Sequence, residues 1–110
     1  LLGAAELQEI GYHFPDNSNE FKDIDSKILL ERTFIMISER GYGIVNLDCT
    51  VCLEKPKIAP FISDMKKIIS SILKTEAEDI AIKATTTEKM GFTGREEGVV
   101  AMAAVLLSKK

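Results

Sequence analysis

The sequence lacks the features that mark several large protein classes. No apolar run approaches the roughly 20 residues that a membrane-spanning helix requires, and no basic segment with a small-residue cleavage site marks a secretory leader. Its 14 Lys and Arg against 17 Asp and Glu give a net charge of -3 and a pI near 5.2. A nucleic-acid surface needs clustered positive charge, so we expect no nucleic-acid or membrane partner, and any phosphate site must be local.

Cysteine and histidine are also scarce. Cys49 and Cys52 have the C-x-x-C spacing of redox and metal motifs. On a strand, residues three apart point to opposite faces, where neither a disulfide nor shared metal coordination is easy. We therefore expect two packing residues. His13 is the only histidine, and we expect it to be a solvent-facing or loop residue rather than a ligand.

The composition is that of a folded domain. Of the 110 residues, 45% are hydrophobic and 28% are charged, which predicts one domain over residues 1–110. A monomer of this size buries only about two-thirds of its unfolded surface, so oligomerisation would add stability without being required. Residues 1–7 have helix-forming composition without an initiating Met or an N-cap residue. We therefore expect the chain to begin inside a helix that Gly11 ends, followed by a polar loop over 12–23.

Hydrophobic periodicity predicts the remaining elements. Residues 26–40 have helical spacing, and residues 45–54 alternate as a strand with one buried face. Pro60 suits the first turn of a further helix, and residues 80–84 form a short strand candidate. The apolar run 99–107 is open between strand and buried helix, because its alanines favour helix and its valines favour strand. This order predicts an α+β fold, a two-layer sandwich with a small mixed sheet and helices on one face.

A polar loop separates the last two apolar segments. Residues 85–95, Thr-Thr-Thr-Glu-Lys-Met-Gly-Phe-Thr-Gly-Arg, combine hydroxyls, a carboxylate, two glycines and two basic side chains. Hydroxyls and glycine-permitted backbone amides donate to phosphoryl oxygens, Arg pairs with them bidentately, and a carboxylate can hold a cation that bridges two phosphates. The alternative is a solvated loop of polar turn residues.

The run from Lys83 to Arg95 closely resembles the signature of the 2-C-methyl-D-erythritol 2,4-cyclodiphosphate synthase family. Further matching segments occur in the family's order over the whole chain: Leu1-Leu2-Gly3-Ala4-Ala5, Ile10-Gly11, Phe14-Pro15-Asp16 and Pro56-Lys57. The resemblance implies an enzyme of the non-mevalonate isoprenoid pathway. It would convert 4-diphosphocytidyl-2-C-methyl-D-erythritol 2-phosphate into the cyclic diphosphate and release CMP. It further implies a homotrimer with active sites between subunits, and two cofactors, zinc and either magnesium or manganese.

The resemblance also assigns roles to residues of this chain. Glu88 matches the carboxylate that binds the bridging magnesium or manganese, and Thr86 matches a catalytic threonine that contacts the phosphates. Arg95 and Glu97 are alternatively placed at an isoprenoid diphosphate in the family's central cavity. The residues implied to bind substrate are Glu9, Ile10, Gly11, Phe14, Asp16, Leu53, Glu54, Lys55, Pro56, Lys57, Ile58, Ala59, Thr85, Thr87, Phe92 and Arg95.

The chain departs from the family pattern at several points. Glu9 stands where the family usually has Asp, and Asn17 and Ser18 stand where a Thr-Asp pair is common. The family's zinc ligands precede the matching segment, so they are not in this chain. Two alternatives therefore stay open: a non-catalytic trimer that binds a diphosphate or isoprenoid, and one domain of a bifunctional enzyme. The family implies a cytoplasmic protein in bacteria and a plastid protein in plastid-bearing eukaryotes.

Overall fold

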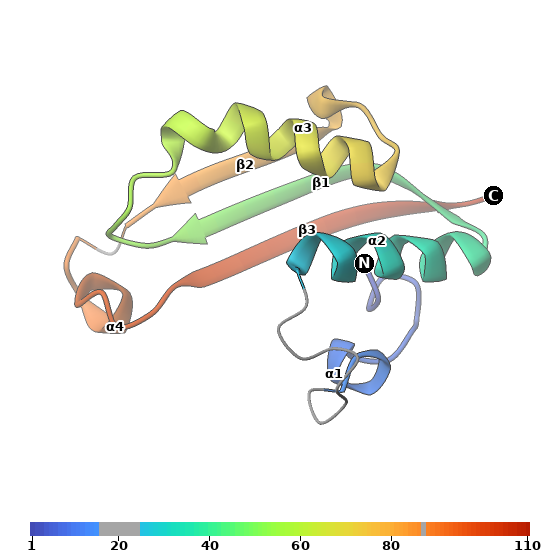
Figure 1. Cartoon of the computed structure of the whole chain (residues 1–110), viewed down its shortest axis with the longest axis horizontal. Helices are drawn as coiled ribbons and strands as arrows, with labels where there is room; N and C mark the ends of the chain where they lie inside the picture. Colours follow the sequence, from blue (N-terminus) through green and yellow to red (C-terminus); the bar gives the residue numbers. More distant parts are fainter. Residues whose placement is uncertain (16–24, 87) are drawn as a thin grey trace.

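The computed structural model describes residues 1–15, 25–86 and 88–110 (Figure 1). In this part of the chain, no helix is long and apolar enough to span a membrane. The elements in chain order are the helices and strands α1 (Ile10–His13), α2 (Ser26–Glu39), β1 (Tyr42–Cys52), α3 (Ile62–Leu73), β2 (Ile80–Thr85), α4 (Gly91–Gly94) and β3 (Val100–Lys109), with single 3-10 turns at Ala59–Phe61 and Ala77–Asp79.

The three strands form one mixed sheet in the order β2-β1-β3. The central strand β1 runs parallel to β2 and antiparallel to β3. Helix α3 makes the connection between the two parallel strands, which cannot be joined by a tight turn. Parallel pairing brings the carboxyl ends of β1 and β2 to the same edge of the sheet, where Cys52 is the register partner of Thr85.

Helices α2 and α3 lie over one face of the sheet (Figure 1). The core between these layers contains Leu47, Leu73, Ile80 and Ile82, and the side chains of Leu73 and Ile80 are 1% and 2% exposed. Asp25 begins α2 as its N-cap, because its carboxylate accepts the backbone N–H of Lys27 at 2.8 Å. The predicted α+β class, with a small mixed sheet and helices, is therefore confirmed.

The opposite face of the sheet carries both apolar and charged side chains and is uncovered by any helix in the described ranges. Strand alternation places Met102 and Leu106 on this face, and they are 59% and 55% exposed. The same face carries an ion pair between Lys83 Nζ and Asp48 Oδ1 at 3.1 Å. We call this surface, defined by Asp48, Lys83, Met102 and Leu106, the open sheet face.

Several predicted elements are confirmed. The helix expected over 26–40 is α2, the helix expected from Pro60 is α3, and the short strand at 80–84 is β2. The ambiguous run 99–107 is the strand β3, because it pairs with β1 along nearly its whole length. Cross-strand pairing, which is not a local property, decides this segment.

The expected opening helix is wrong. Residues 2–6 form successive turns, in which Leu7 N–H donates to the Leu2 carbonyl at 2.9 Å, and Glu6 has a φ of 59° that no helix contains. Gly11 lies within α1 instead of ending a helix, and the expected loop over 12–23 begins with helical residues. Residues 16–24 of that loop lie outside the described part of the chain. The predicted strand over 45–54 is also shifted, since β1 starts at Tyr42 and ends at Cys52.

Candidate functional site

The carboxyl ends of β1 and β2 form a small cavity. The backbone N–H of Leu53 donates to the carbonyl of Thr85 at 3.1 Å and joins the two chain segments that leave these strands. The cavity has a volume of about 210 Å³ and is lined by Leu53, Pro56, Lys57, Ile58, Ala59, Ala84, Thr85 and Thr86. Five residues of the predicted segment 53–59 and two predicted threonines are thus brought together, although more than 25 residues of chain separate them, whereas Glu54 and Lys55 do not line the cavity.

The segment after Thr85 is a tight turn built on a threonine hydroxyl. The Oγ1 atom of Thr86 accepts the backbone N–H of Glu88 at 3.2 Å, which is the geometry of a Ser/Thr turn. Glu88 and Lys89 then have φ values of 53° and 66°, in the left-handed region. Glu88 is exposed, and its backbone contacts Thr86, which lines the cavity. Thr87, another predicted substrate contact, lies outside the described residues.

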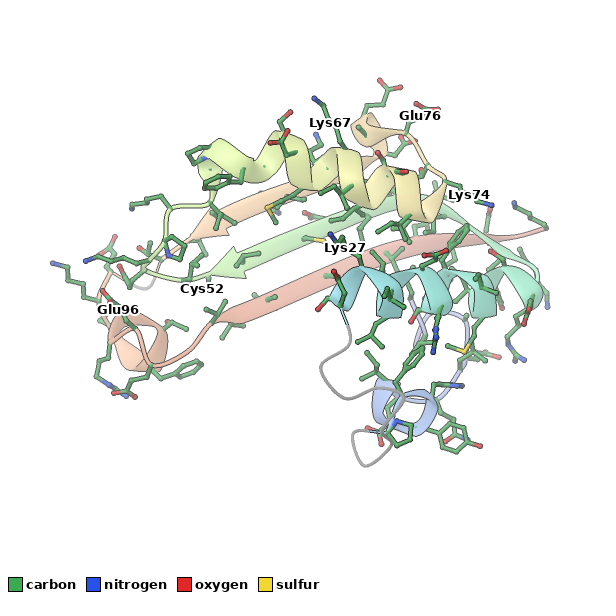
Figure 2. All side chains as sticks on the ribbon, viewed as in Figure 1. Lys27, Cys52, Lys67, Lys74, Glu76 and Glu96 are labelled. Atoms are coloured by element: carbon green, nitrogen blue, oxygen red, sulfur yellow. The ribbon has the colours of Figure 1, made fainter. Side chains whose placement is uncertain are left out.

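Helix α4 follows this turn and is anchored to the end of β1. The buried Sγ of Cys52 lies 3.8 Å from Oγ1 of Thr93, and Figure 2 shows Cys52 at the same end of the molecule as Glu96. Phe92 is half exposed, and a Cβ on Gly98 would lie 3.1 Å from its ring, so the two residues are in close contact. Sequence reasoning missed α4, because four residues with two glycines carry no helical signal.

Arg95 is already engaged with a carboxylate of its own chain. Its Nε and one terminal nitrogen donate to the two carboxylate oxygens of Glu97 at 2.8 and 3.3 Å. Both side chains are more than half exposed, so this pair is worth about 1 kcal/mol at most. Glu97 uses only two of the five N–H donors of Arg95, so an anionic ligand can bind the remaining donors or compete with Glu97.

The N-terminal group of predicted substrate residues lies elsewhere in the protomer. Glu9 and Ile10 line a mainly apolar cavity of about 620 Å³ between the N-terminal turns, α2 and β3. Gly11 and Phe14 follow in and after α1, and Asp16 lies outside the described residues. This cavity shares no lining residue with the one at Thr85 and Thr86. In Figure 1, α1 and α4 are well separated, so one protomer does not bring the two predicted groups together.

The described residues include a carboxylate that suits magnesium or manganese, but they do not include a set of ligands for zinc. Within residues 1–15, 25–86 and 88–110, no three His, Cys, Asp or Glu side chains form a group that could hold a metal. Magnesium often binds through one or two carboxylates and otherwise to phosphates and water, and the exposed Glu88 fits that role. Structural or catalytic zinc needs three or four protein ligands, which these residues do not supply.

The sulfur and imidazole groups are packing residues. Cys49 and Cys52 are both free, and Cys49 packs on the helix-covered core while Cys52 contacts Thr93. Burial, and secondarily the charge of Asp48, raise the pKa of the Cys49 thiol, which disfavours the reactive thiolate. The expectation for His13 is wrong in part. It is half buried at the end of α1, with its ring edge-to-face with Tyr12 at 5.1 Å.

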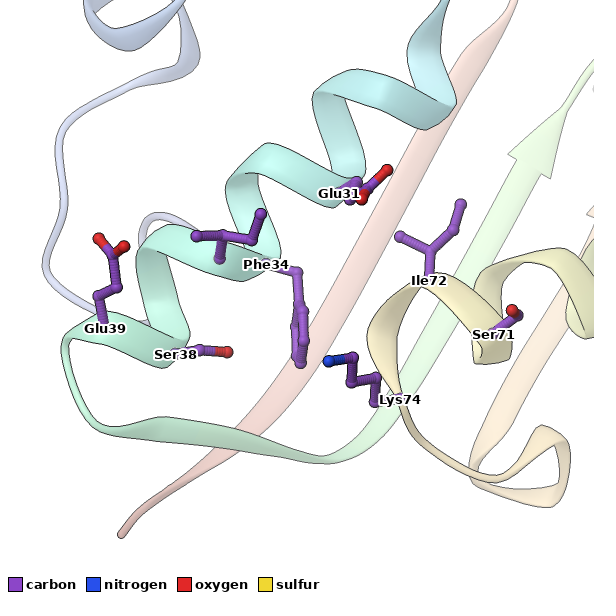
Figure 3. Close-up of a pocket in the computed structure, with 8 residues that line it drawn as sticks. Glu31, Phe34, Ser38, Glu39, Ser71, Ile72 and Lys74 are labelled. Carbon is purple, nitrogen blue, oxygen red and sulfur yellow. The ribbon is translucent and has the colours of Figure 1, made fainter.

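A further hollow of about 530 Å³ lies between α2 and α3 on the outer surface (Figure 3). Phe34 and Lys74 point into it from the two helices, and Glu31 and Glu39 stand along α2. Sequence reasoning did not identify this hollow, because it depends on how two separately predicted helices pack. Its lining includes none of the residues that the family resemblance singles out.

Comparisons with known proteins agree with this geometry. A profile of the YgbB family matches residues 1–108. The 2-C-methyl-D-erythritol 2,4-cyclodiphosphate synthase of Bacteroides fragilis is 54% identical over 109 residues, which are 99% of this chain and 69% of that protein. Among solved structures, the bifunctional IspDF from Campylobacter jejuni matches with a TM-score of 0.94 and 38% identity, over 99% of this chain and 30% of that one.

The CDP complex of IspF from Plasmodium falciparum has a TM-score of 0.85 and 32% identity, over 99% of this chain and 65% of that one. The match therefore includes both cavities, the Thr86 turn and every strand of the sheet. The chain belongs to the YgbB family, the family of 2-C-methyl-D-erythritol 2,4-cyclodiphosphate synthases.

Proposed function

We propose that this chain carries out the family reaction, in which 4-diphosphocytidyl-2-C-methyl-D-erythritol 2-phosphate is cyclised to 2-C-methyl-D-erythritol 2,4-cyclodiphosphate with release of CMP. The observation that carries the proposal is the cavity lined by residues of the 53–59 segment and by Thr85 and Thr86, with Glu88 exposed in the turn that follows. The relative from Bacteroides fragilis that bears this enzyme's name is 54% identical over nearly the whole chain.

The reaction is an internal phosphoryl transfer. An oxygen of the substrate's 2-phosphate forms a bond to the β-phosphorus, and the bond from that phosphorus to the oxygen bridging to the α-phosphate breaks. CMP leaves with the electron pair of that bond. Such a reaction requires alignment and charge stabilisation and needs no side-chain nucleophile. A magnesium or manganese ion, if bound, would supply positive charge that stabilises the negative charge of the phosphates.

The chain's own residues would align the substrate. In this proposal the loop from Leu53 to Ala59 receives the cytidine, largely through backbone groups and against the apolar wall of the cavity. Thr86 directs its hydroxyl to the phosphates, with Thr85 and Thr87 as its neighbours in sequence, and Glu88 would hold the magnesium or manganese ion. Glu9, Ile10, Gly11, Phe14 and Asp16 contact the methylerythritol moiety, and Phe92 and Arg95 complete the binding set. Zinc is not assigned to any described residue.

We further propose that residues 1–110 act as one domain within a homotrimer whose sites lie between neighbouring subunits. Two features support this arrangement. The N-terminal and C-terminal groups of site residues line separate cavities of one protomer, so a complete site needs a second copy. The open sheet face also exposes Met102 and Leu106, which a neighbouring subunit would cover.

The central test is direct. The full-length protein is incubated with the substrate, magnesium and zinc, and CMP release is followed by chromatography. Activity that disappears on chelation and returns with added metal supports the proposal. A protein that binds CDP but releases no CMP would instead support the alternative of a non-catalytic diphosphate-binding protein. The Campylobacter jejuni structure is named as bifunctional, so a second activity on the same polypeptide is compatible with the proposal.

Thr86 offers a test of the phosphate contact. We expect Thr86→Val to lower the rate of CMP release by roughly 10- to 100-fold, because a hydrogen bond to a charged group is worth about 1.5–3 kcal/mol. Thr86→Ser keeps the hydroxyl and the turn hydrogen bond to Glu88, so its rate should stay within about threefold of wild type. Equal loss in both variants would contradict a role of the hydroxyl alone, because Ser keeps the hydroxyl and loses only the methyl group.

Met102 offers a test of the trimer. We expect Met102→Glu to shift the mass in solution from three protomers towards one, because the charge would be buried between subunits. The single protomer should tolerate the change, since Met102 is 59% exposed. Light scattering after size-exclusion chromatography measures the mass. Ile35→Glu, at a similarly exposed site on α2, is the control. A wild-type monomer would rule out the homotrimer, and an unchanged trimer in Met102→Glu would place the interface elsewhere.

A further inference from the structure

One carboxylate joins the two loops of the candidate site. The backbone N–H of Lys89 donates to Oε1 of Glu54 at 2.9 Å, across 35 positions of sequence. Glu54 is partly buried and lies in the segment after β1, whereas Lys89 lies in the turn after β2. This side chain therefore connects the cytidine-side segment to the turn that carries Glu88.

That turn has a backbone conformation that needs support. Glu88 and Lys89 both have positive φ values, 53° and 66°, without being glycine. Such residues are energetically unfavourable and persist only where the surroundings fix them. The Oγ1 of Thr86 accepts the N–H of Glu88, and Glu54 accepts the next N–H along the chain. Two successive amides of the strained turn are thus each held by a side-chain acceptor.

The backbone of Lys89 also packs closely against Gly94, the last residue of α4. A Cβ at Gly94 would overlap the backbone carbon and Cα of Lys89, so only glycine fits there. Glu54 thus holds the N–H of Lys89, while Gly94 packs against its Cα and carbonyl group. If the Glu54 acceptor were removed, only the contact with Gly94 would remain and the turn could relax.

We propose that Glu54 is a positioning residue, which fixes the left-handed Glu88–Lys89 turn through the Lys89 amide and so sets the direction of the Glu88 carboxylate. The inference rests on the proposed function, and it gives Glu54 a role different from direct substrate contact. A carboxylate accepts from an amide more strongly than a neutral group does, but an amide oxygen of the same length can take its place.

The test compares Glu54→Ala with Glu54→Gln in the full-length protein. Glu54→Ala should lower kcat for CMP release about tenfold and raise the magnesium concentration needed for half-maximal rate, with a smaller change in KM. Glu54→Gln should stay within about threefold of wild type in both quantities. Glu76→Ala, an exposed carboxylate before the Ala77–Asp79 turn, should match wild type.

Hydrogen exchange supplies a readout that does not depend on catalysis. In Glu54→Ala, the peptide that contains Lys89 should exchange its amide protons several-fold faster, and Glu54→Gln should restore protection. Equal kinetic loss in the Gln and Ala variants would overturn the proposal, because the charge itself would then be required. Unchanged exchange in the Ala variant would also overturn it. A wild-type protein that releases no CMP would remove the proposed function, while the exchange result would still decide whether Glu54 fixes the turn.

Discussion

Glu88→Gln is expected to lower the rate of CMP release by about 10²-fold or more while the unfolding midpoint stays unchanged. A bound metal ion contributes several kcal/mol to the stabilisation of transition-state charge, and each 1.36 kcal/mol is a factor of ten in rate. The glutamine keeps the shape of the side chain but loses the negative charge that would hold the ion. The Glu88 side chain is exposed, so the fold should not depend on its charge.

The matched control for this variant is Glu78→Gln. Glu78 is also exposed, but it lies in the Ala77–Asp79 turn at the beginning of β2, whereas Glu88 follows the end of that strand. Its variant should release CMP at the wild-type rate. Steady-state rates over a magnesium titration, together with thermal unfolding, separate the effects on ion binding from those on folding. A Glu88→Gln protein with full activity at limiting magnesium would remove Glu88 from the ion site.

Leu73→Ala should have the largest effect on stability. Leu73 is the last residue of α3 and is 1% exposed in the core with Leu47, Ile80 and Ile82. Truncation of a fully buried leucine costs about 2–5 kcal/mol, through lost burial and the cavity left behind. Domains of this size have a total stability of about 5–15 kcal/mol, so a large share would be lost. Urea unfolding followed by circular dichroism measures the change.

Ile68→Ala on the same helix is the control for this prediction. Its side chain is 45% exposed, so the same kind of truncation should reduce the free energy of unfolding by about 1 kcal/mol or less. Similar losses in the two variants would show that Leu73 does not occupy the centre of the core. A change in the urea dependence itself would instead indicate an altered unfolded state.

The sequence predicts the fold well where the signal is local. The helical spacing over 26–40 and the alternation around Leu47 both correspond to observed elements, because one face of each is buried. Residues 99–107 could not be settled in this way, since the pairing of β3 with β1 comes from a segment about 55 residues away. The composition of residues 1–7 predicts a helix where the structure has turns, and the reason is again a contact between distant residues. The turns are held by this contact, in which Arg40 Nε donates to the Ala5 carbonyl at 2.8 Å.

The sequence predicts which residues belong to the candidate site, but it does not predict which of them lie together in one protomer. The segment 53–59 and Thr86 were expected to act together, and the shared cavity places them together. The separation of Glu9 and Ile10 from that cavity had no signal in the sequence, because it depends on how α1 lies relative to the sheet. The sequence likewise contains no signal for the contact between Glu54 and Lys89. This contact requires both the register of β1 with β2 and the left-handed turn that follows.

The parallel pairing of β1 and β2 also sets an order of events during synthesis on the ribosome. β1 is made first, but its neighbour β2 emerges only after α3, and the Thr86 turn emerges later still. Pairings between distant segments form slowly because the intervening chain must close first. A nascent chain that stops before β2 therefore contains only the first part of the cavity lining, within residues 53–59, and leaves both edges of β1 unpaired. The other edge of β1 stays unpaired still longer, because its partner β3 ends only at Lys109. Protection of this strand from aggregation therefore has to come from other sources until β3 has left the exit tunnel.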